Sequence, residues 1–220
     1  GHTVLVTHSR TDEAASTWLS KQAADGYTFR SYDVDVANWD SCQRMAERIA
    51  ADGHQIDILV NNAGITRDGT LRKMGKDKWD AVLRVNLDSV FNVTKPFIDG
   101  MVERGWGRIV NISSINGNKG QFGQTNYSAA KAGMHGFTKA LAQEVAKKGV
   151  TVNTVSPGYL GTSMVTAVPE DVLKQIVAGI PVGRLGKPEE IAALVAFIAS
   201  ETAAYMTGSN VSMNGGQHMY

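Results

Sequence analysis

Short apolar runs alternate with longer mixed segments along the 220-residue chain. The short runs are rich in β-branched residues and bounded by polar ones, which predicts buried strands of a parallel sheet covered on both faces. These predicted strands span residues 3–7, 27–32, 56–60, 108–113, 150–155 and 210–213. The longer segments predict helices that end near residues 26, 53, 103, 148 and 199. Strands that alternate with helices of about ten or more residues predict an α/β fold with a doubly wound parallel sheet.

Capping residues and helix breakers bound several of the predicted helices. Thr11 can cap the first helix and Asn38 the second, because their side-chain oxygens accept hydrogen bonds from backbone N–H groups of the first turn. The first helix is expected to bury Ala15, Trp18 and Leu19. Pro96 lacks a backbone N–H, so the long helix at 76–103 should kink or break near residues 92–96. Residues 159–183 have weak periodicity and are expected to form a lid.

Composition narrows the class of protein. The length fits one domain over residues 1–220, and a net charge of +1 argues against nucleic acid or an anionic membrane as the main partner. Cys42 is the only cysteine, so no intrachain disulfide can form, and we expect a cytoplasmic protein. The longest apolar run, residues 191–199, is about half of what a bilayer span requires. The five histidines show no metal-ligand spacing, so no metal site is expected.

One stretch contains a candidate catalytic set. Tyr127 and Lys131 are four residues apart, which places both side chains on one helix face, and Ser114 precedes them at a predicted strand end. A nearby ammonium favours the ionised phenol, so Lys131 is expected to lower the pKa of Tyr127 and make it a usable proton donor and acceptor. The Ser114 hydroxyl can bind a substrate carbonyl, and Ser113 is the competing serine. A tyrosine–lysine pair at this spacing is common by chance, so its weight depends on the motifs around it.

Other polar motifs follow the predicted strands. They are Ser9 and Arg10, Asp35 and Val36, Asn62, Ala63 and Gly64, and Pro157 and Gly158. Open parallel sheets bind ligands at the carboxyl ends of their strands, so these residues are expected to meet at one ligand site. The segment 62–64 can also be read as an ordinary strand-to-helix turn.

The combination of motifs resembles the short-chain dehydrogenase/reductase family over nearly the whole chain. It comprises Asn61-Asn62-Ala63-Gly64, Asn86, Ser114, Tyr127-x-x-x-Lys131 and Ser156-Pro157-Gly158. The resemblance implies a Rossmann-type fold and an oxidoreductase in which Tyr127 donates a proton to a ketone oxygen that Ser114 polarises. Lys131 would hold the nicotinamide ribose. Asn86 would position a water that connects Lys131 to solvent, unless it is only a buried helix residue satisfied by the backbone.

The same resemblance implies a nicotinamide dinucleotide and its contacts. Asp35 and Val36 would flank the adenine, and the backbone of residues 62–64 would pass the ribose. Family members that select NAD place a carboxylate after the strand at 3–7, where this chain has Ser9 and Arg10, which suit phosphate. We therefore expect NADPH, with Arg10 as a plain surface residue as the alternative. Tyr127, Lys131, Pro157 and Gly158 complete the expected cofactor set.

Within the family, the chain is most similar to the NADPH-dependent acetoacetyl-CoA reductases of polyhydroxybutyrate biosynthesis. The similarity rests on residues 61–68, 105–114, 120–127 and 183–190. It implies an acetoacetyl pocket lined by Asp68, Gln121, Phe122, Gln124 and Tyr159. The chain would then reduce acetoacetyl-CoA to (R)-3-hydroxybutyryl-CoA as a homotetramer built from its long helices and C-terminal segment.

Two alternatives to this function stay open. Pro169 stands where a basic residue could have met CoA phosphates, which favours a 3-oxoacyl-[acyl-carrier-protein] reductase of fatty-acid synthesis. The second alternative is not an enzyme: the chain would be a non-catalytic scaffold that kept the fold and binds NADPH.

One part of the family pattern has no counterpart in the sequence. Family members begin with a strand and a Thr-Gly-x-x-x-Gly-x-Gly turn that cradles the pyrophosphate, whereas this chain begins at what should be the second strand. The strands at 3–7 and 56–60 are then expected to face an empty position in the sheet, about 9.6 Å wide. We expect either that a first strand and helix belong to a longer chain, or that the sheet rearranges to close the gap. In both cases the 220 residues alone should bind NADPH poorly and be inactive.

Overall fold

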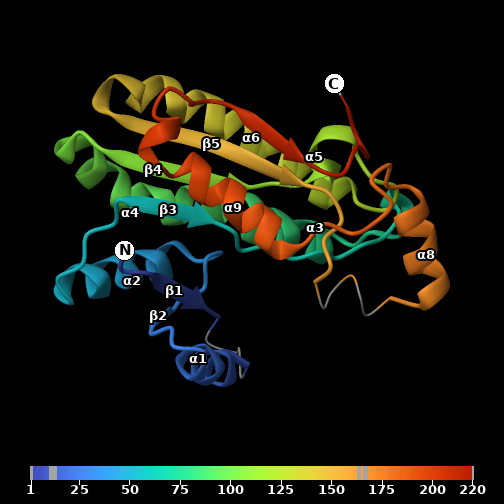
Figure 1. The fold of residues 1–220 in the computed structure, drawn as a ribbon, viewed down its shortest axis with the longest axis horizontal. Coiled ribbons are helices and arrows are strands. Elements are labelled where there is room, and N and C mark those ends of the chain that lie inside the picture. Colours follow the sequence, from blue (N-terminus) through green and yellow to red (C-terminus); the bar gives the residue numbers. More distant parts are fainter. Residues whose placement is uncertain (1, 10–13, 163–164, 166–167, 220) are drawn as a thin grey trace.

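The computed structural model describes residues 2–9, 14–162, 165 and 168–219. Its strands are β1 (Leu5–His8), β2 (Arg30–Asp33), β3 (Ile58–Asn61), β4 (Gly107–Ile112), β5 (Val150–Pro157) and β6 (Asn210–Met213). Its longer helices are α1 (Ala14–Ala24), α2 (Trp39–Ala51), α3 (Lys76–Leu83), α4 (Ser89–Arg104), α6 (Thr125–Val145), α8 (Glu170–Ala178) and α9 (Pro188–Ile198). A short helix, α5 (Ile115–Lys119), follows β4 and was not predicted. The predicted α/β order of elements is confirmed (Figure 1).

The strands form two parallel sheets. β1 pairs only with β2, and the second sheet has the order β3-β4-β5-β6, with every pair parallel. Figure 1 shows the β1–β2 pair apart from the four-stranded sheet. In the part of the chain that the structure describes, no ladder joins the two sheets, so β1 and β3 each keep one unpaired edge. This division falls at the position where the sequence predicted an empty place.

Helices cover both faces of the four-stranded sheet. Ile109 and Val152 pack in one cluster with residues of α4 and α6. Val110 and Val155 point to the other face and pack with Ile191 of α9. Because successive side chains of a strand alternate between faces, near-continuous apolar strands are what a sheet buried on both sides requires.

The β1–β2 pair is attached through α2. Tyr32 and Val34 pack against Met45 and neighbouring residues of α2, and partly buried residues of α4 join this cluster. Asn38 caps α2 as predicted, because its side chain accepts a hydrogen bond from Ser41 N at 2.8 Å. The predicted cap Thr11 lies outside the described residues.

The predicted burial by α1 is wrong for Trp18. This side chain is 44% exposed and stacks on Phe29 with ring centroids 5.4 Å apart, while Ala15 and Leu19 are only half-buried. None of the residues of α1 is fully buried. The β1–β2 pair that α1 covers is therefore too small to bury a full face of this helix.

Of the two outcomes predicted near residues 92–96, the break is wrong, and the kink stays a prediction. α4 continues through Pro96 to Arg104, and the irregularity lies earlier, in a π-helical turn at Arg84–Asp88 that joins α3 to α4. Pro96 removes one backbone donor, which a long packed helix tolerates, whereas the wide π-turn gives Asn86 room to bond outside its helix.

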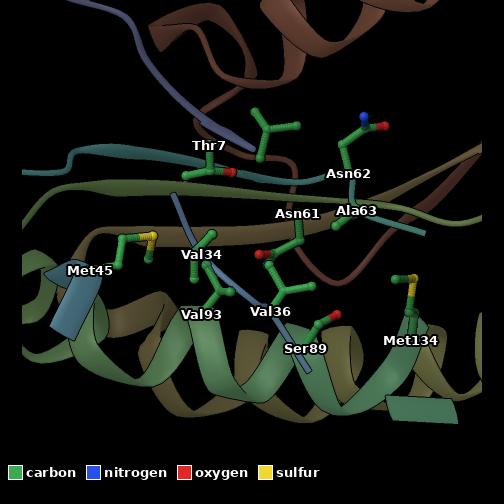
Figure 2. Close-up of a pocket in the computed structure, with 11 residues that line it drawn as sticks. Thr7, Val34, Val36, Met45, Asn61, Asn62, Ala63, Ser89, Val93 and Met134 are labelled. Carbon is green, nitrogen blue, oxygen red and sulfur yellow. The ribbon is translucent and has the colours of Figure 1, made fainter. Parts of the chain in front are cut away.

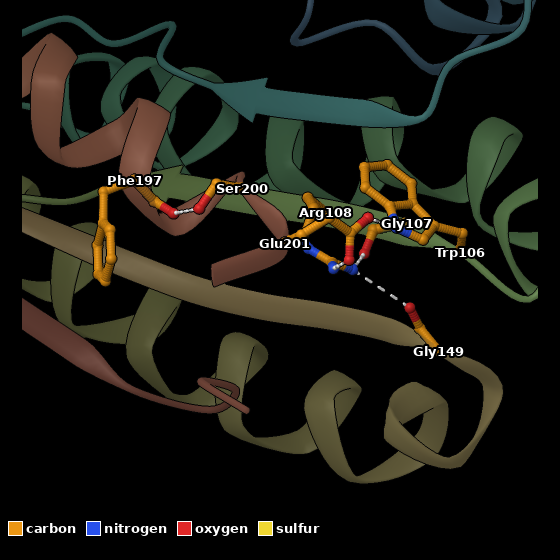
Figure 3. A network of polar contacts seen from close by, with 7 residues as sticks. All are labelled: Trp106, Gly107, Arg108, Gly149, Phe197, Ser200 and Glu201. Atoms are coloured by element: carbon orange, nitrogen blue, oxygen red, sulfur yellow. Dashed lines mark hydrogen bonds and ion pairs between the residues drawn. The ribbon is translucent and has the colours of Figure 1, made fainter. Parts of the chain in front are cut away.

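A buried cation anchors the amino end of β4 (Figure 3). Arg108 is 2% exposed, lies 4.4 Å from the Trp106 ring centroid and donates to the carbonyls of Gly107 and Gly149 at 2.9 and 3.4 Å. Glu201 accepts from Arg108 at 3.4 Å and from Trp106 at 2.5 Å. This cluster fixes the amino end of β4, whereas the candidate catalytic residues follow the carboxyl end of the same strand.

Other predicted elements are recovered with small shifts. α9 begins with Pro188 in its first turn, β6 has the predicted bounds, and α8 lies inside the segment predicted to form a lid. Among the described helices, none combines the length and the apolar character that crossing a membrane would need.

Candidate active site

The two serines after β4 face different partners. Ser114 caps α5, and its Oγ accepts a hydrogen bond from Asn116 N at 3.1 Å. Its hydroxyl also acts on the phenol of Tyr127 and lowers the pKa of that group. Ser113 is buried and instead donates to the backbone carbonyl of Lys131 at 2.9 Å. The geometry therefore places Ser114, and not Ser113, beside the phenol.

Tyr127 lies in the first turn of α6, with its side chain half-buried. Burial raises the pKa of Tyr127, and the charges of Asp68 and Tyr159 act in the same direction, while the influence of the Ser114 hydroxyl lowers it. The net direction is opposite to the predicted lowering by Lys131. Desolvation of the phenolate outweighs the favourable contact, so the phenol keeps its proton at neutral pH.

Lys131 lies one turn further along α6, on the same face as Tyr127, as the spacing predicted. It is 3% exposed, its Nζ donates to the carbonyl of Ile112 at 2.8 Å, and it lies 5.6 Å from the centroid of the Tyr127 ring. Burial lowers the pKa of Lys131 to about 8. The ammonium is thus held under the ring rather than at the phenolic oxygen, which explains why it does not lower the tyrosine pKa.

Asn86 supports the loop after β3. Its amide nitrogen donates to the carbonyls of Ile65 and Val82, both at 2.9 Å, and its oxygen accepts from Ile65 N at 3.2 Å. Its side chain is therefore satisfied by the backbone, which was the simpler of the two sequence interpretations. The water-positioning role stays a prediction.

The carboxyl ends of β1 and β3 flank a small cavity of about 50 Å³ that is partly open to solvent (Figure 2). Val36, Asn62 and Ala63 of the predicted cofactor set line it, together with Thr7 and Ser89. The three candidate catalytic residues at 114, 127 and 131 are not among its lining residues. The cavity therefore lies beside the catalytic set, between the two sheets.

Gly64 connects this cavity to the catalytic lysine. A Cβ at Gly64 would lie 2.7 Å from Asn86 Oδ1 and 3.5 Å from Lys131 Nζ, so only glycine fits. Residues 62–64 are exposed, which leaves their backbone open to a bound group close to the ammonium.

The remaining predicted cofactor residues have varied surroundings. Asp35 accepts a hydrogen bond from Ala37 N at 3.0 Å and so orders its own turn. Ser9 follows β1, and Pro157 ends β5. Arg10 lies outside the described residues. Gly158 has no room for a side chain, because a Cβ there would lie 2.7 Å from Gln217 Oε1.

Of the predicted substrate residues, Asp68 and Tyr159 lie near enough to Tyr127 to raise its pKa, and Gln124 is bonded to Asp68. Gln124 donates to Asp68 at 3.0 Å and accepts from Asn116 at 2.9 Å, which fixes its amide between them. Gln121 accepts from Lys119 at 3.0 Å, and Phe122 is 87% exposed on the same loop. Tyr159 approaches from the chain after β5, where its backbone N–H donates to Gln217 at 3.3 Å.

Sequence reasoning missed four residues that shape this site. They are Asn116, Asn126, His135 and Gln217. Asn126 donates to the carbonyls of Arg67 and Lys78, which ties the loop after β3 to α6. Asn116, Asn126 and His135 lie within about one helical turn of a recognised motif, and that adjacency was the available signal. Gln217 reaches the site only through the fold, because it is 58 residues from Tyr159 in the chain.

Comparison with known proteins agrees with this geometry. A family model described as Enoyl-(Acyl carrier protein) reductase matches residues 1–218. The chain is 60% identical over 202 residues to the acetoacetyl-CoA reductase of Cupriavidus necator, covering 92% of this chain and 82% of that protein. The chain belongs to the short-chain dehydrogenase/reductase family.

Other family members are similar at comparable coverage. The acetoacetyl-CoA reductase of Allochromatium vinosum is 55% identical, with 97% of this chain and 87% of the relative covered. The 3-oxoacyl-[acyl-carrier-protein] reductase of Vibrio cholerae is 46% identical, with 84% and 76% covered.

Membership of the short-chain dehydrogenase/reductase family implies an oxidoreductase with a nicotinamide cofactor. The residues present fit such a group. Lys131 is a buried cation that forms no ion pair within the described part of the chain, so a hydroxyl-rich ligand can meet it. Gly64 has no side chain, so the backbone next to the Lys131 ammonium stays open to a bound ligand.

Proposed function

We propose that this protein reduces acetoacetyl-CoA to (R)-3-hydroxybutyryl-CoA with NADPH, in polyhydroxybutyrate biosynthesis. The observation that carries this proposal is the Ser114 hydroxyl acting on the phenol of Tyr127, beside the buried ammonium of Lys131. These are the three groups that reduction of a ketone needs: a polariser, an acid and a cation. Several relatives with 48–60% identity are named acetoacetyl-CoA reductase, which supports the substrate.

In this proposal Tyr127 is the general acid. Because burial raises its pKa, the phenol is protonated at neutral pH and can transfer its proton to the ketone oxygen. The Ser114 hydroxyl donates to the same oxygen and stabilises the charge that develops on it. NADPH, when bound, supplies the hydride that adds to the carbonyl carbon, so that the ketone becomes a secondary alcohol.

In this mechanism Lys131 binds and positions the cofactor. Its ammonium is held by the Ile112 carbonyl at the end of β4, next to the open backbone at Gly64. From there it would hold the nicotinamide ribose, with Asn62 and Ala63 alongside. Asp35, Val36, Pro157 and Gly158 would complete the cofactor site.

The preference for NADPH rests on the sequence after β1. Ser9 and Arg10 stand where a carboxylate would select NADH, and a guanidinium there attracts the additional phosphate of NADPH. The test compares kcat/KM for the two cofactors. A higher value with NADH would reject this assignment.

Acetoacetyl-CoA competes with an acyl-carrier-protein thioester as the substrate. Most of the residues proposed for the substrate site are polar, with Phe122 for a short acyl chain and Gln124 and Tyr159 for the thioester. The deciding measurement is kcat/KM for acetoacetyl-CoA against acetoacetyl-[acyl-carrier-protein], with crotonyl-CoA as a control that offers no ketone. A clear preference for the carrier protein would replace the CoA assignment, and reduction of crotonyl-CoA would reject ketone reduction as the main activity.

Assembly and location complete the proposal. A cytoplasmic homotetramer built from the long helices and the C-terminal segment is supported by exposed aromatic residues on α4 and its neighbour α2. Phe91 is 52% exposed and stacks on Trp39 with ring centroids 5.6 Å apart. Light scattering that finds a stable monomer at working concentration would reject the tetramer. Lack of turnover with every ketone tested would favour a non-catalytic NADPH-binding scaffold.

A further inference from the structure

His135 lies one turn after Lys131 in α6 and contacts both neighbouring strands. Its Nε2 is 2.9 Å from Ser113 Oγ at the end of β4 and 3.5 Å from Ser156 Oγ in β5. The imidazole is half-buried, and the proposed reduction gives it no task.

The direction of these hydrogen bonds follows from the serines. Ser113 donates its only hydroxyl hydrogen to the Lys131 carbonyl at 2.9 Å, and Ser156 donates its own to Asn210 Oδ1 at 2.7 Å. Both hydroxyl oxygens are then acceptors toward the ring, so His135 Nε2 must carry a hydrogen and donate it. Burial and the nearby Lys139 lower the pKa of His135, so the ring is neutral at neutral pH with that hydrogen on Nε2.

The contact holds the backbone that carries the catalytic lysine. Ser113 is fixed to β5, because its N–H donates to the Val155 carbonyl at 2.8 Å, and Ser114 is the next residue. Gly117 of α5 presses on the same turn of α6: a Cβ there would lie 2.9 Å from the Lys131 carbonyl carbon. The strand end and the helix that Ser114 caps thus both meet α6 at Lys131.

We propose that His135 and Ser113 form a positioning pair, which sets the separation of Ser114 from Tyr127. This inference rests on the proposed ketone reduction, in which those two groups must meet one substrate oxygen. The Nε2–H of His135 keeps the Ser113 hydroxyl turned toward the Lys131 carbonyl. Without that donor the hydroxyl can rotate away, and the end of β4 loses its link to α6. A displacement of about 1 Å at a reacting centre lowers a rate by up to about a hundredfold.

The test compares His135→Leu, Ser113→Ala and the double variant. Each single change is expected to lower kcat by about ten- to a hundredfold, with KM for NADPH unchanged, because the Ile112 carbonyl still holds the Lys131 ammonium. The double variant should be no slower than the slower single variant, since both changes break the same link. His135→Gln, which keeps an N–H donor, should restore most of the lost kcat.

Ser128→Ala is the matched control. The Ser128 hydroxyl is buried one residue after Tyr127 and has no hydrogen-bond partner among the residues that the structure describes, so its removal should leave kcat unchanged. A wild-type kcat for His135→Leu would overturn the proposal, and so would a His135→Gln variant as slow as His135→Leu. If His135→Leu does not fold, Ser113→Ala against Ser128→Ala decides the same question.

Melting temperatures of the same variants separate this inference from the proposed function. Coupling between residues 113 and 135 in both Tm and kcat supports the positioning pair. Coupling in Tm alone means that the bond exists without a catalytic role, and additivity in both measurements means that no link exists; either result overturns the proposal. Full turnover by Tyr127→Phe would reject the proposed acid, while the Tm cycle would still report on the contact.

Discussion

At the scale of single residues, burial decides the ionisation of the catalytic groups. It raises the pKa of Tyr127 and lowers that of Lys131 to about 8, and both shifts favour the neutral form of a group taken out of water. The phenol is thereby kept as an acid. Lys131 carries a desolvation cost, because its ammonium is charged at neutral pH in a buried position.

Replacing Tyr127 by Phe should abolish most of the reduction. Only the proton donor is lost, so kcat should fall by about 10²- to 10⁴-fold while the dissociation constant for NADPH stays nearly unchanged. Steady-state kinetics and a fluorescence titration of NADPH measure the two effects. The control is Tyr205→Phe, whose phenol is fully exposed and should have no role. Substantial turnover by Tyr127→Phe would assign the acid to another group.

Replacing Lys131 by Met should stabilise the fold while it abolishes activity. Between the folded-state pKa of about 8 and the ordinary value of 10.5, the unfolded chain binds a proton that the folded protein has lost, so this group adds stability as pH rises through that window. Below pH 8 both states are charged and the full burial penalty applies. At pH 7 the Met variant should therefore melt about 2–6 °C higher.

The control for this change is Lys139→Met, an exposed cation two turns further along α6, for which Tm should not move. A lower Tm for Lys131→Met would mean that the bond to the Ile112 carbonyl outweighs the desolvation of the ammonium.

At the scale of elements, one buried polar network links five of them. Asn61 of β3 donates to Thr94 of α4 at 3.1 Å and to Asn111 of β4 at 2.8 Å. Asn111 and Thr154 of β5 both donate to Thr138 of α6 at 2.8 Å. Since buried polar groups are costly when unpaired, this network selects one arrangement of helices on the sheet below the catalytic residues.

Thr138→Val should destabilise the protein by about 1–3 kcal/mol, because it leaves the Asn111 amide and the Thr154 hydroxyl without their shared acceptor. Thr151→Val is the comparison, since the Thr151 hydroxyl is already buried without a partner and its loss should be neutral or favourable. Urea denaturation gives both free energies of unfolding. Equal effects of the two changes would show that the network adds nothing.

At the scale of the whole molecule, the two sheets differ in how well they are enclosed. Every residue of β5 is buried, and β4 is buried from Gly107 to Asn111, whereas β1 has one paired edge and no fully buried residue. The free edges of β1 and β3 border the cavity in Figure 2, where water can reach their backbone groups. The molecule thus has a rigid part that carries the catalytic set and a weakly enclosed part that faces the predicted adenine side.

Amide hydrogen exchange should follow this difference. Amides of β1 and β2 are expected to exchange faster than those of β4 and β5 by on the order of a hundredfold, because a two-stranded pair opens at low cost. Mass spectrometry of peptides from the two sheets measures this directly. Equal protection would mean that both sheets unfold only together.

The sequence by itself determined the order of the elements and the parallel pairing of the strands, and it supplied the candidate catalytic set as a prediction. These follow from short-range regularities: alternation marks the strands, and a spacing of four residues places Tyr127 and Lys131 on one helix face. The sequence also anticipated the separation between β1 and β3. The tertiary structure alone decided that Ser113 is turned to the Lys131 carbonyl, that the helix irregularity lies at 84–88 and that burial raises the pKa of Tyr127. Each of these depends on burial and on partners distant in the chain, such as Ser113 with His135. The spacing of residues in the sequence does not show which charged groups lose their contact with water when the chain folds.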